Sequence, residues 1–234
     1  MKGISFIVPV YNGENTIEKC IKSILSQELT CETEIIVVDN GSTDKTIKLL
    51  ENFPRIILIK ETTRGRSKAR NSGAQMAKYS LLSFIDCDVV LSPQWANQLM
   101  QVLRSPFGAV QTPIVVQDRK KVAELYYLNS VSKYQTLDSA AMMISKEVFS
   151  EIKGFSEEFS CWEDTELTMR LMNHGYGLMV VAPCQAMKYQ DRNLWQLCIR
   201  AFKIGRISGG AVKSWSGKKP VRLNDIASFL TKKA

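Results

Sequence analysis

The chain has 234 residues. Its hydrophobic fraction of 45% and charged fraction of 23% are those of an ordinary globular protein, with room for one α/β domain or two small ones. An excess of 31 Lys and Arg over 23 Asp and Glu gives a net charge of +8, which favours an anionic partner: nucleic acid, an acidic membrane surface or a phosphorylated small molecule. The one histidine, His174, lies in a run typical of a helix end, which disfavours triad hydrolases and HExxH metalloenzymes.

The cysteines and the hydropathy indicate a cytoplasmic protein. The six cysteines form no CxxC pair and have no regular spacing, so we expect reduced thiols and neither a disulfide framework nor a zinc site. No signal peptide opens the sequence, and no apolar run is long enough to span a bilayer.

The first predicted strand, Ile4 to Val10, is a nearly continuous apolar run of the kind found in a parallel sheet buried on both faces. It runs into a Pro-Val-Tyr-Asn-Gly loop, which we place at the carboxyl edge of the sheet, where ligands bind in open α/β folds. Tyr11 in this loop is positioned either to stack on a base or to pack on the sheet edge. The following helix has one buried stripe, formed by Ile17, Cys20, Ile21, Ile24 and Leu25.

A second buried strand, residues 34–38, runs into the polar turn that starts at Asp39. At the same sheet edge, the Asp39 carboxylate is suited to accept from the imide N–H of uracil or from a ribose hydroxyl. Ser42 or Thr43 is expected to cap a helix over residues 46–52. A third short strand is predicted over residues 56–59.

The segment 64–74 brings four cations onto a loop and the start of a helix. Backbone N–H groups and arginine side chains at a helix N-terminus suit a diphosphate, although a solvated basic face has a similar composition. The alternation of strands and helices predicts a parallel sheet with right-handed crossovers.

Residues 81–93 predict a fourth buried strand whose carboxyl end carries Asp86 and Asp88. Residues two apart on an extended segment point the same way, so both carboxylates are expected to face one site. Hard oxygen ligands of this kind suit Mg²⁺ or Mn²⁺. The alternative is an Asp-rich turn that caps the helix after Pro93.

The second half of the chain has fewer clear signals. We expect a strand over residues 111–117, a helix over 121–134, a helix that begins near Glu163 and is closed by Gly175, and a last strand over 177–183. The tail from Leu194 to Trp215 has a basic amphipathic pattern, suited to lie on an anionic membrane, to close over the site or to pack on the catalytic domain.

Five motifs in order resemble family 2 glycosyltransferases, over about residues 1–190. They are Pro9-Val10-Tyr11-Asn12, the segment Val37 to Asp44, Ala69-Arg70-Asn71 with Gly73, Asp86-Cys87-Asp88, and the segments 153–159 and 162–167 followed by Arg170 and Gly175-Tyr176. Together the motifs are far more specific than any one alone.

The resemblance implies a GT-A fold: an α/β, Rossmann-like, mostly parallel central sheet flanked by helices. It implies a catalytic domain over residues 1–190, with a nucleotide-sugar half (1–100) and an acceptor half (101–190), followed by a basic amphipathic helical tail (191–234). The implied activity is a metal-dependent inverting transfer of a sugar from a nucleoside diphosphate sugar, with UDP expected, to a saccharide or lipid-linked acceptor. We therefore expect a cytoplasmic enzyme, in peripheral contact with the inner face of an anionic membrane where the acceptor is lipid-linked.

The resemblance also implies roles for single residues, and it places residues 138–141 in the region where relatives have small residues that line the sugar pocket. Asp39 would contact the base, Arg70 the base or diphosphate, and Asp86 the ribose or metal. Asp88 would be the direct ligand of Mn²⁺ or Mg²⁺, and Asp164, next to Glu163, the general base. Acids in the first turn of a helix are also favoured by its dipole, which is the alternative reading of this pair. The residues expected at the nucleotide are Pro9, Tyr11, Asn12, Glu14, Asp39, Gly41, Arg66, Arg70, Asp86 and Cys87.

The chain departs from the family pattern at two positions. Many relatives have a histidine metal ligand after the last strand, where this chain has Tyr189 or Gln190. Three alternatives follow: Gln190 offers its carbonyl oxygen to the metal, Lys188 places its own charge on the diphosphate, or metal binding stays weak until the donor arrives. The second departure is Asn40, where relatives often have an acid.

Other functions fit the sequence less well. A sugar nucleotidyltransferase would have a Gly-rich basic loop after the first strand, and an NAD-dependent oxidoreductase would have GxGxxG there. Nucleic-acid binding is disfavoured because the basic residues are not interleaved with aromatic residues on one platform. A degenerate, non-catalytic nucleotide-binding module is supported only by the missing histidine.

Overall fold

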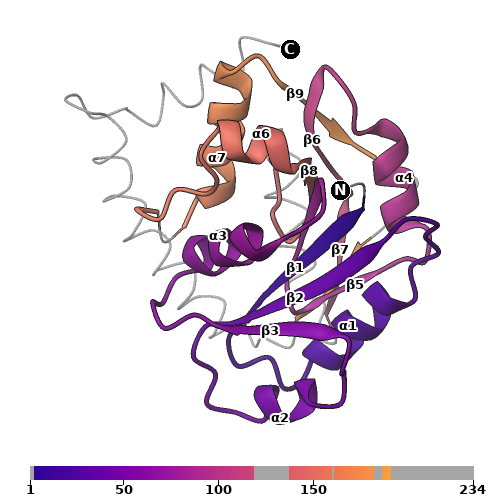
Figure 1. Ribbon diagram of the computed structural model, residues 1–234, viewed down its shortest axis with the longest axis vertical. Coiled ribbons are helices and arrows are strands. Elements are labelled where there is room, and N and C mark those ends of the chain that lie inside the picture. The colour runs from indigo at the N-terminus through magenta and orange to yellow at the C-terminus, as the bar shows by residue number, and fades with distance from the viewer. Residues whose placement is uncertain (1–2, 119–136, 160, 182–185, 191–234) are drawn as a thin grey trace.

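The computed structural model describes residues 3–118, 137–159, 161–181 and 186–190 (Figure 1). Within them, a seven-stranded sheet has the order β3-β2-β1-β4-β8-β6-β9, and a second sheet has the order β5-β10-β7. The predicted helix over 121–134 and the tail 191–234 lie outside the described residues. Cys20, Cys31 and Cys87 have free thiols.

The first half of the chain alternates strand and helix, as predicted. β1 pairs in parallel with β2 and β4, and β2 pairs in parallel with β3. These elements are β1 (Ile4–Val10), α1 (Ile17–Leu25), β2 (Thr33–Asp39), α2 (Thr46–Leu50), β3 (Ile56–Lys60), α3 (Arg66–Met76), β4 (Leu81–Ile85), β5 (Val89–Leu91) and α4 (Trp95–Val102).

The second half completes the sheet with one reversed strand. β8 runs antiparallel to both β4 and β6, whereas β9 runs parallel to β6. The sheet is therefore mostly parallel, and the predicted fold class is confirmed. The remaining elements are β6 (Phe107–Gln111), β7 (Ile114–Asp118), β8 (Ala141–Ser145), α6 (Lys146–Glu151), α7 (Glu163–Asn173), β9 (Gly177–Val180) and β10 (Ala186–Gln190).

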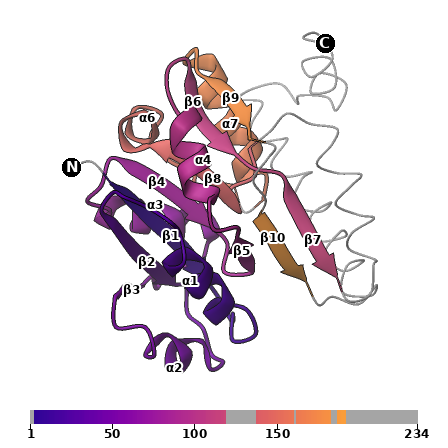
Figure 2. The same ribbon diagram turned by 90° about the vertical axis from the view of Figure 1, so that its right-hand side faces the viewer.

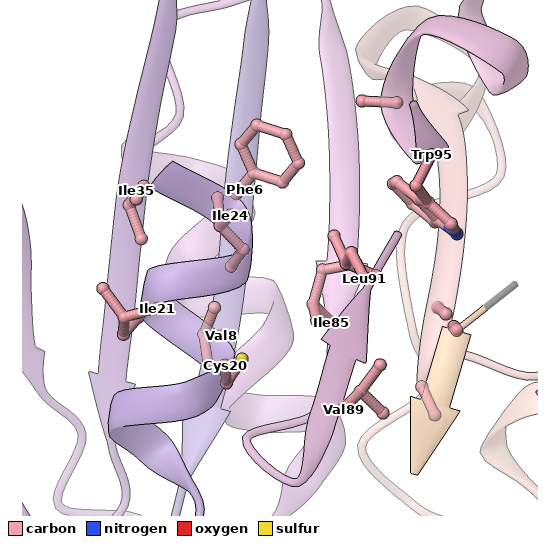
Figure 3. Close-up of a cluster of buried hydrophobic side chains, with 14 of the residues drawn as sticks. Phe6, Val8, Cys20, Ile21, Ile24, Ile35, Ile85, Val89, Leu91 and Trp95 are labelled. Atoms are coloured by element: carbon pink, nitrogen blue, oxygen red, sulfur yellow. The ribbon is translucent and has the colours of Figure 1, made fainter. Parts of the chain in front are cut away.

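Apolar side chains fill the space on both faces of the large sheet, which is why its central strands read as continuous apolar runs. On one face, α1 and α4 cover a cluster in which Cys20, Ile21 and Ile24 pack over β1 and β2 (Figure 3). On the other face, α3, α6 and α7 cover a cluster that includes Ile7 and Phe84. Successive β1 residues serve opposite clusters, as the two-residue period of a strand requires.

Gly73 allows α3 to lie close to β1 and β2. A Cβ at this position would meet Cγ2 of Ile7 at 2.5 Å and Cγ2 of Val38 at 3.1 Å, so no larger residue fits without moving the helix. This close approach fixes the depth of Arg70, which lies one turn earlier on the same helix.

The predicted strand over residues 111–117 is wrong, because the chain changes sheets within it. β6 ends at Gln111, and β7 begins at Ile114, where it pairs with β10 beside the large sheet (Figure 2). Pro113 has no N–H to donate to a strand ladder, so the break falls at Thr112-Pro113. The indole N–H of Trp95 donates to Oγ1 of Thr112 at 2.9 Å and anchors this crossing.

Two predicted helix ends differ in their outcome. The expected caps of α2, Ser42 and Thr43, are wrong: Oδ1 of Asp44 accepts the backbone N–H of Thr46 at 3.0 Å, because Ser42 and Thr43 bond with the loop after β1 instead. The closure of α7 by Gly175 is confirmed, with a φ of +83° that favours glycine. The ring of His174 lies at the same helix end, with Nδ1 2.8 Å from the carbonyl oxygen of Arg170.

Candidate active site

The loops after β1 and β2 are tied together at the carboxyl edge of the large sheet. Oδ1 of Asn12 accepts the backbone N–H of Thr43 at 2.8 Å, and the Asn12 backbone N–H donates to Oγ of Ser42 at 2.9 Å. The Asp39 carboxylate is buried and accepts the Ser42 N–H at 3.1 Å. The register pairs Val10 with Asp39, so both loops leave the sheet at the same level.

The other residues predicted at the nucleotide are of two kinds: some support the loops, and others are exposed to solvent. Pro9 is buried within β1, and Gly41 has a φ of +86°, which explains the glycine in this turn. Oε2 of Glu14 accepts the Lys45 N–H at 3.1 Å. Tyr11 keeps 47% of its surface exposed, and the guanidinium carbon of Arg64 lies over its ring, 4.6 Å from the ring centroid.

Asn40, the second departure from the family pattern, anchors the basic loop. Its Nδ2 donates to the carbonyl oxygens of Glu61 at 3.1 Å and Thr63 at 2.8 Å, and its Oδ1 accepts the Gly65 N–H at 2.8 Å. A carboxylate cannot make the two donations. An amide at this position therefore holds the start of α3 against the end of β2.

Asp86 and Asp88 face one site, but by a different route from the one expected. β4 ends at Ile85, and the Val89 N–H donates to the carbonyl oxygen of Asp86 at 3.0 Å, which makes residues 86–88 a turn and not an extended strand. Nζ of Lys188 lies 2.7 Å from Oδ2 of Asp86 and 3.3 Å from Oδ1 of Asp88. Between the two acids, burial raises the pKa of the Cys87 thiol to about 12, so this group stays neutral at physiological pH.

Arg70 joins this turn to the start of α7. It is 1% exposed, and its guanidinium contacts Oδ1 of Asp86 at 2.8 Å and Oε1 of Glu163 at 3.1 Å. Arg66 also lies 3.5 Å from Glu163, but 53% of its side chain is exposed. Burial opposes the charge on Asp86, yet the cations of Lys188 and Arg70 outweigh it and hold the pKa of Asp86 well below its ordinary value.

Asp164 has a different environment from its neighbour Glu163. Oγ of Ser139 donates to Oδ1 of Asp164 at 2.6 Å, while Glu163 is buried and paired with Arg70. Burial, together with the nearby carboxylate of Glu163, raises the pKa of Asp164 to about 7. Ser139 was predicted only as one of the small residues that line a pocket. Its hydrogen bond shows that it also contacts the candidate base Asp164.

The residues around Asp86 and Asp88 do not fit a divalent ion in this arrangement. The Lys188 ammonium lies within reach of both carboxylates, and Arg70 binds the other oxygen of Asp86. Across the described ranges, no group of three or more His, Cys, Asp and Glu residues comes together to hold a metal ion. Gln190 lies in β10, paired with Asp118, and its side chain lies outside the part of the chain that the structure describes.

Comparison with known proteins identifies the family. Residues 5–155 match the model of Glycosyl transferase family 2. The chain belongs to this family. It is 24% identical to glycosyltransferase AglE of Haloferax volcanii over 91% of the chain and 74% of AglE. It is 34% identical to a poly-beta-1,6-N-acetyl-D-glucosamine synthase of Staphylococcus epidermidis, over 100% of the chain and 58% of the synthase.

Solved structures of glycosyltransferases share the fold. TarS of S. aureus superposes with a TM-score of 0.63 at 21% identity, over 82% of this chain and 37% of TarS. The mannosyltransferase PcManGT of Pyrobaculum calidifontis, in complex with GDP-Man and Mn²⁺, gives a TM-score of 0.62 at 21% identity, over 79% of this chain and 56% of that protein. The fold is therefore of the GT-A type, and the family 2 chain spans only part of several of these proteins.

Among the helices that the structure describes, none combines the length and the apolar character that crossing a membrane requires.

Proposed function

We propose that this family 2 chain transfers a sugar, a hexose or hexosamine, from a nucleoside diphosphate sugar to an acceptor hydroxyl with inversion at the anomeric carbon. The observation that carries the proposal is the Arg70 bridge, which holds Asp86 of the donor-side turn and Glu163, the neighbour of Asp164, in one buried network. A candidate base thereby lies beside the carboxylates expected to face the diphosphate.

Asp164 acts as the general base in this proposal. Its carboxylate takes the proton of the acceptor hydroxyl while the hydroxyl oxygen forms a bond to the anomeric carbon. The bond from that carbon to the diphosphate oxygen breaks, and its electron pair leaves with the nucleoside diphosphate. A pKa of about 7 suits this role, because about half of the Asp164 carboxylates are then ionised near pH 7, and the ionised form is basic enough to accept a proton.

The donor is expected to bind across the tied loops of the first half, residues 1–100. Asp39 accepts from the base or ribose, the exposed ring of Tyr11 stacks on the base, and Arg66 contacts the diphosphate. Arg70 is too deeply buried for direct contact with the donor in this arrangement, so we assign it the positioning of Asp86 and Glu163. Residues 101–190 then provide the acceptor side.

UDP is the expected nucleotide, and the product is expected to be a surface polysaccharide or glycolipid. TarS has been solved with UDP and PcManGT with GDP-Man and Mn²⁺, while the named product of the staphylococcal synthase is poly-beta-1,6-N-acetyl-D-glucosamine. A lipid-linked acceptor would place the enzyme at the cytoplasmic face of a membrane. The Mn²⁺ or Mg²⁺ implied by the family would have Asp88 as its ligand, but no step is assigned to it because Lys188 holds this position.

Calorimetry with UDP, GDP and their sugars, followed by transfer assays, tests the proposal. We expect one nucleotide to bind, Asp39→Asn to weaken its binding, and Asp164→Asn to leave binding intact while lowering kcat by about 10²- to 10⁴-fold. Binding of a nucleotide sugar without transfer to any acceptor by wild type would favour the degenerate binding module. Failure of every nucleotide to bind would refute the donor site.

A further inference from the structure

The position of Lys188 is set by backbone pairing on both sides of β10. Lys188 lies opposite Val89 of β5 in the antiparallel pair and opposite Val116 of β7 in the parallel pair. The next backbone N–H, that of Tyr189, donates to the carbonyl oxygen of Asp88 at 2.8 Å. The second sheet therefore delivers the Lys188 side chain to the Asp86–Asp88 turn across 102 residues of sequence.

The Lys188 ammonium occupies a buried, acidic position. The residue is 6% exposed, and its Nζ lies 2.7 Å from Asp86 and 3.3 Å from Asp88. A buried ammonium is costly unless carboxylates compensate it, and these two do so. The same pair of carboxylates is what a divalent ion would need, so the ammonium and the ion compete for one place and repel each other.

We propose that the Lys188 ammonium, in place of a divalent ion, supplies the positive charge that offsets the diphosphate as it departs. This inference rests on the proposed function. When the bond between the anomeric carbon and the diphosphate oxygen breaks, the electron pair stays on that oxygen, and a fixed cation nearby stabilises the growing negative charge. The ammonium carries donors in three directions, so it can exchange a carboxylate oxygen for a phosphate oxygen without transferring a proton. Donor binding then requires no metal.

The decisive measurement is UDP and GDP binding by calorimetry, in EDTA and in Mn²⁺, for wild type and Lys188→Met. For wild type we expect the same Kd in both conditions. In EDTA, the variant should bind about 10- to 100-fold more weakly, which corresponds to the loss of one charge-assisted hydrogen bond. With Lys188 removed, Oδ2 of Asp86 and Oδ1 of Asp88 lose the ammonium and can bind Mn²⁺, while Arg70 keeps Oδ1 of Asp86. The variant should therefore show a bound-Mn²⁺ signal by electron paramagnetic resonance that wild type lacks.

Two further variants serve as controls. Lys19→Met removes the same charge from a lysine whose Nζ lies 5.0 Å from the centroid of the Tyr189 ring, beside β10, and should leave nucleotide binding unchanged. Lys188→Arg keeps the charge and should bind nucleotide in EDTA more tightly than Lys188→Met. Circular dichroism establishes that each variant is folded, and the wild-type titrations remain decisive if Lys188→Met does not fold.

The outcomes separate the inference from the function on which it rests. If wild type binds nucleotide only with Mn²⁺, or if folded Lys188→Met binds in EDTA as tightly as wild type, the role of Lys188 is overturned while the donor site stands. If no nucleotide binds in either condition, the donor site itself fails, and the proposed function fails with it.

Discussion

Ser139 and Asp164 are joined by a hydrogen bond of 2.6 Å, in which the serine hydroxyl donates to Oδ1 of the carboxylate. The serine lies in the turn before β8 and the aspartate in the first turn of α7, so the bond connects the sheet to the helix. It orients the candidate base, and it favours the ionised carboxylate against the burial that disfavours it.

The pH dependence of transfer follows from this bond. Because the base must be ionised, kcat/KM should rise with pH through a value of about 7, the pKa of Asp164. Ser139→Ala removes a group that lowers this pKa, so the rising limb should move to higher pH while the plateau at high pH changes less. A full pH profile of both proteins is the measurement, and coincident limbs would exclude Asp164 as the titrating base.

The stability of Asp164→Asn should depend on pH in a defined direction. Burial raises the folded-state pKa of Asp164 to about 7, above its ordinary value of 3.8. This group therefore does not lower the stability of the folded protein below pH 4, and it lowers that stability increasingly as pH rises towards 7. Asparagine avoids this loss. The melting temperature of the variant, relative to that of wild type, should therefore increase between pH 4 and 7 and stay constant above pH 7.

Asp44→Asn serves as a control, because the pKa of Asp44 is shifted in the opposite direction to that of Asp164. Burial opposes the charge on Asp44, but hydrogen bonds from Thr46 outweigh it and lower the pKa of Asp44. The stability that this carboxylate contributes is present above its unfolded pKa and is lost as pH falls through the folded one. Asp44→Asn should thus be less stable than wild type at pH 7, with the difference shrinking in acid. Parallel pH profiles for the two variants would contradict the assignment for Asp164.

Arg70 should matter far more for stability than Arg66, although both contact Glu163. Arg70→Met leaves the buried Glu163 with only the exposed Arg66 beside it, while Asp86 keeps Lys188, and breaking a buried pair such as Arg70 and Glu163 costs about 3–5 kcal/mol of unfolding free energy. Arg66 is 53% exposed, so Arg66→Met should cost about 0–1 kcal/mol. Urea denaturation of both variants measures the difference. Equal losses would mean that the Arg70 bridge does not hold the site together.

The sequence predicted the donor half well because its signals are local. Buried parallel strands are continuous apolar runs, and β1 was predicted at residues 4–10, as observed. The polar residues that follow such strands must gather at one edge of the sheet, which placed Asp39 and Asp86 correctly relative to it. The crossing at Pro113 had a local signal too, but the apolar residues on either side concealed it.

The contacts that define the site were beyond sequence reasoning because they join distant segments. Lys188 meets Asp86 through a strand of a second sheet, whose pairing no local pattern indicates. The resemblance implied that Arg70 contacts the base or diphosphate, whereas its guanidinium is buried between Asp86 and Glu163, two partners that lie elsewhere in the chain. The hydroxyl of Ser139 reaches Asp164 across 25 residues, which only the fold decides.

The packing of α3 provides a last test of how the site is positioned. Gly73→Ala places a Cβ within 2.5 Å of Cγ2 of Ile7, so the helix must move away from the sheet, and overpacking of this kind costs about 1–3 kcal/mol. Because α3 carries Arg70, the same movement should weaken the bridge and lower kcat along with the melting temperature. Gln75→Ala, an exposed position on the same helix, should change neither. If Gly73→Ala lowers the melting temperature with kcat unchanged, the depth of α3 does not set the geometry of the site.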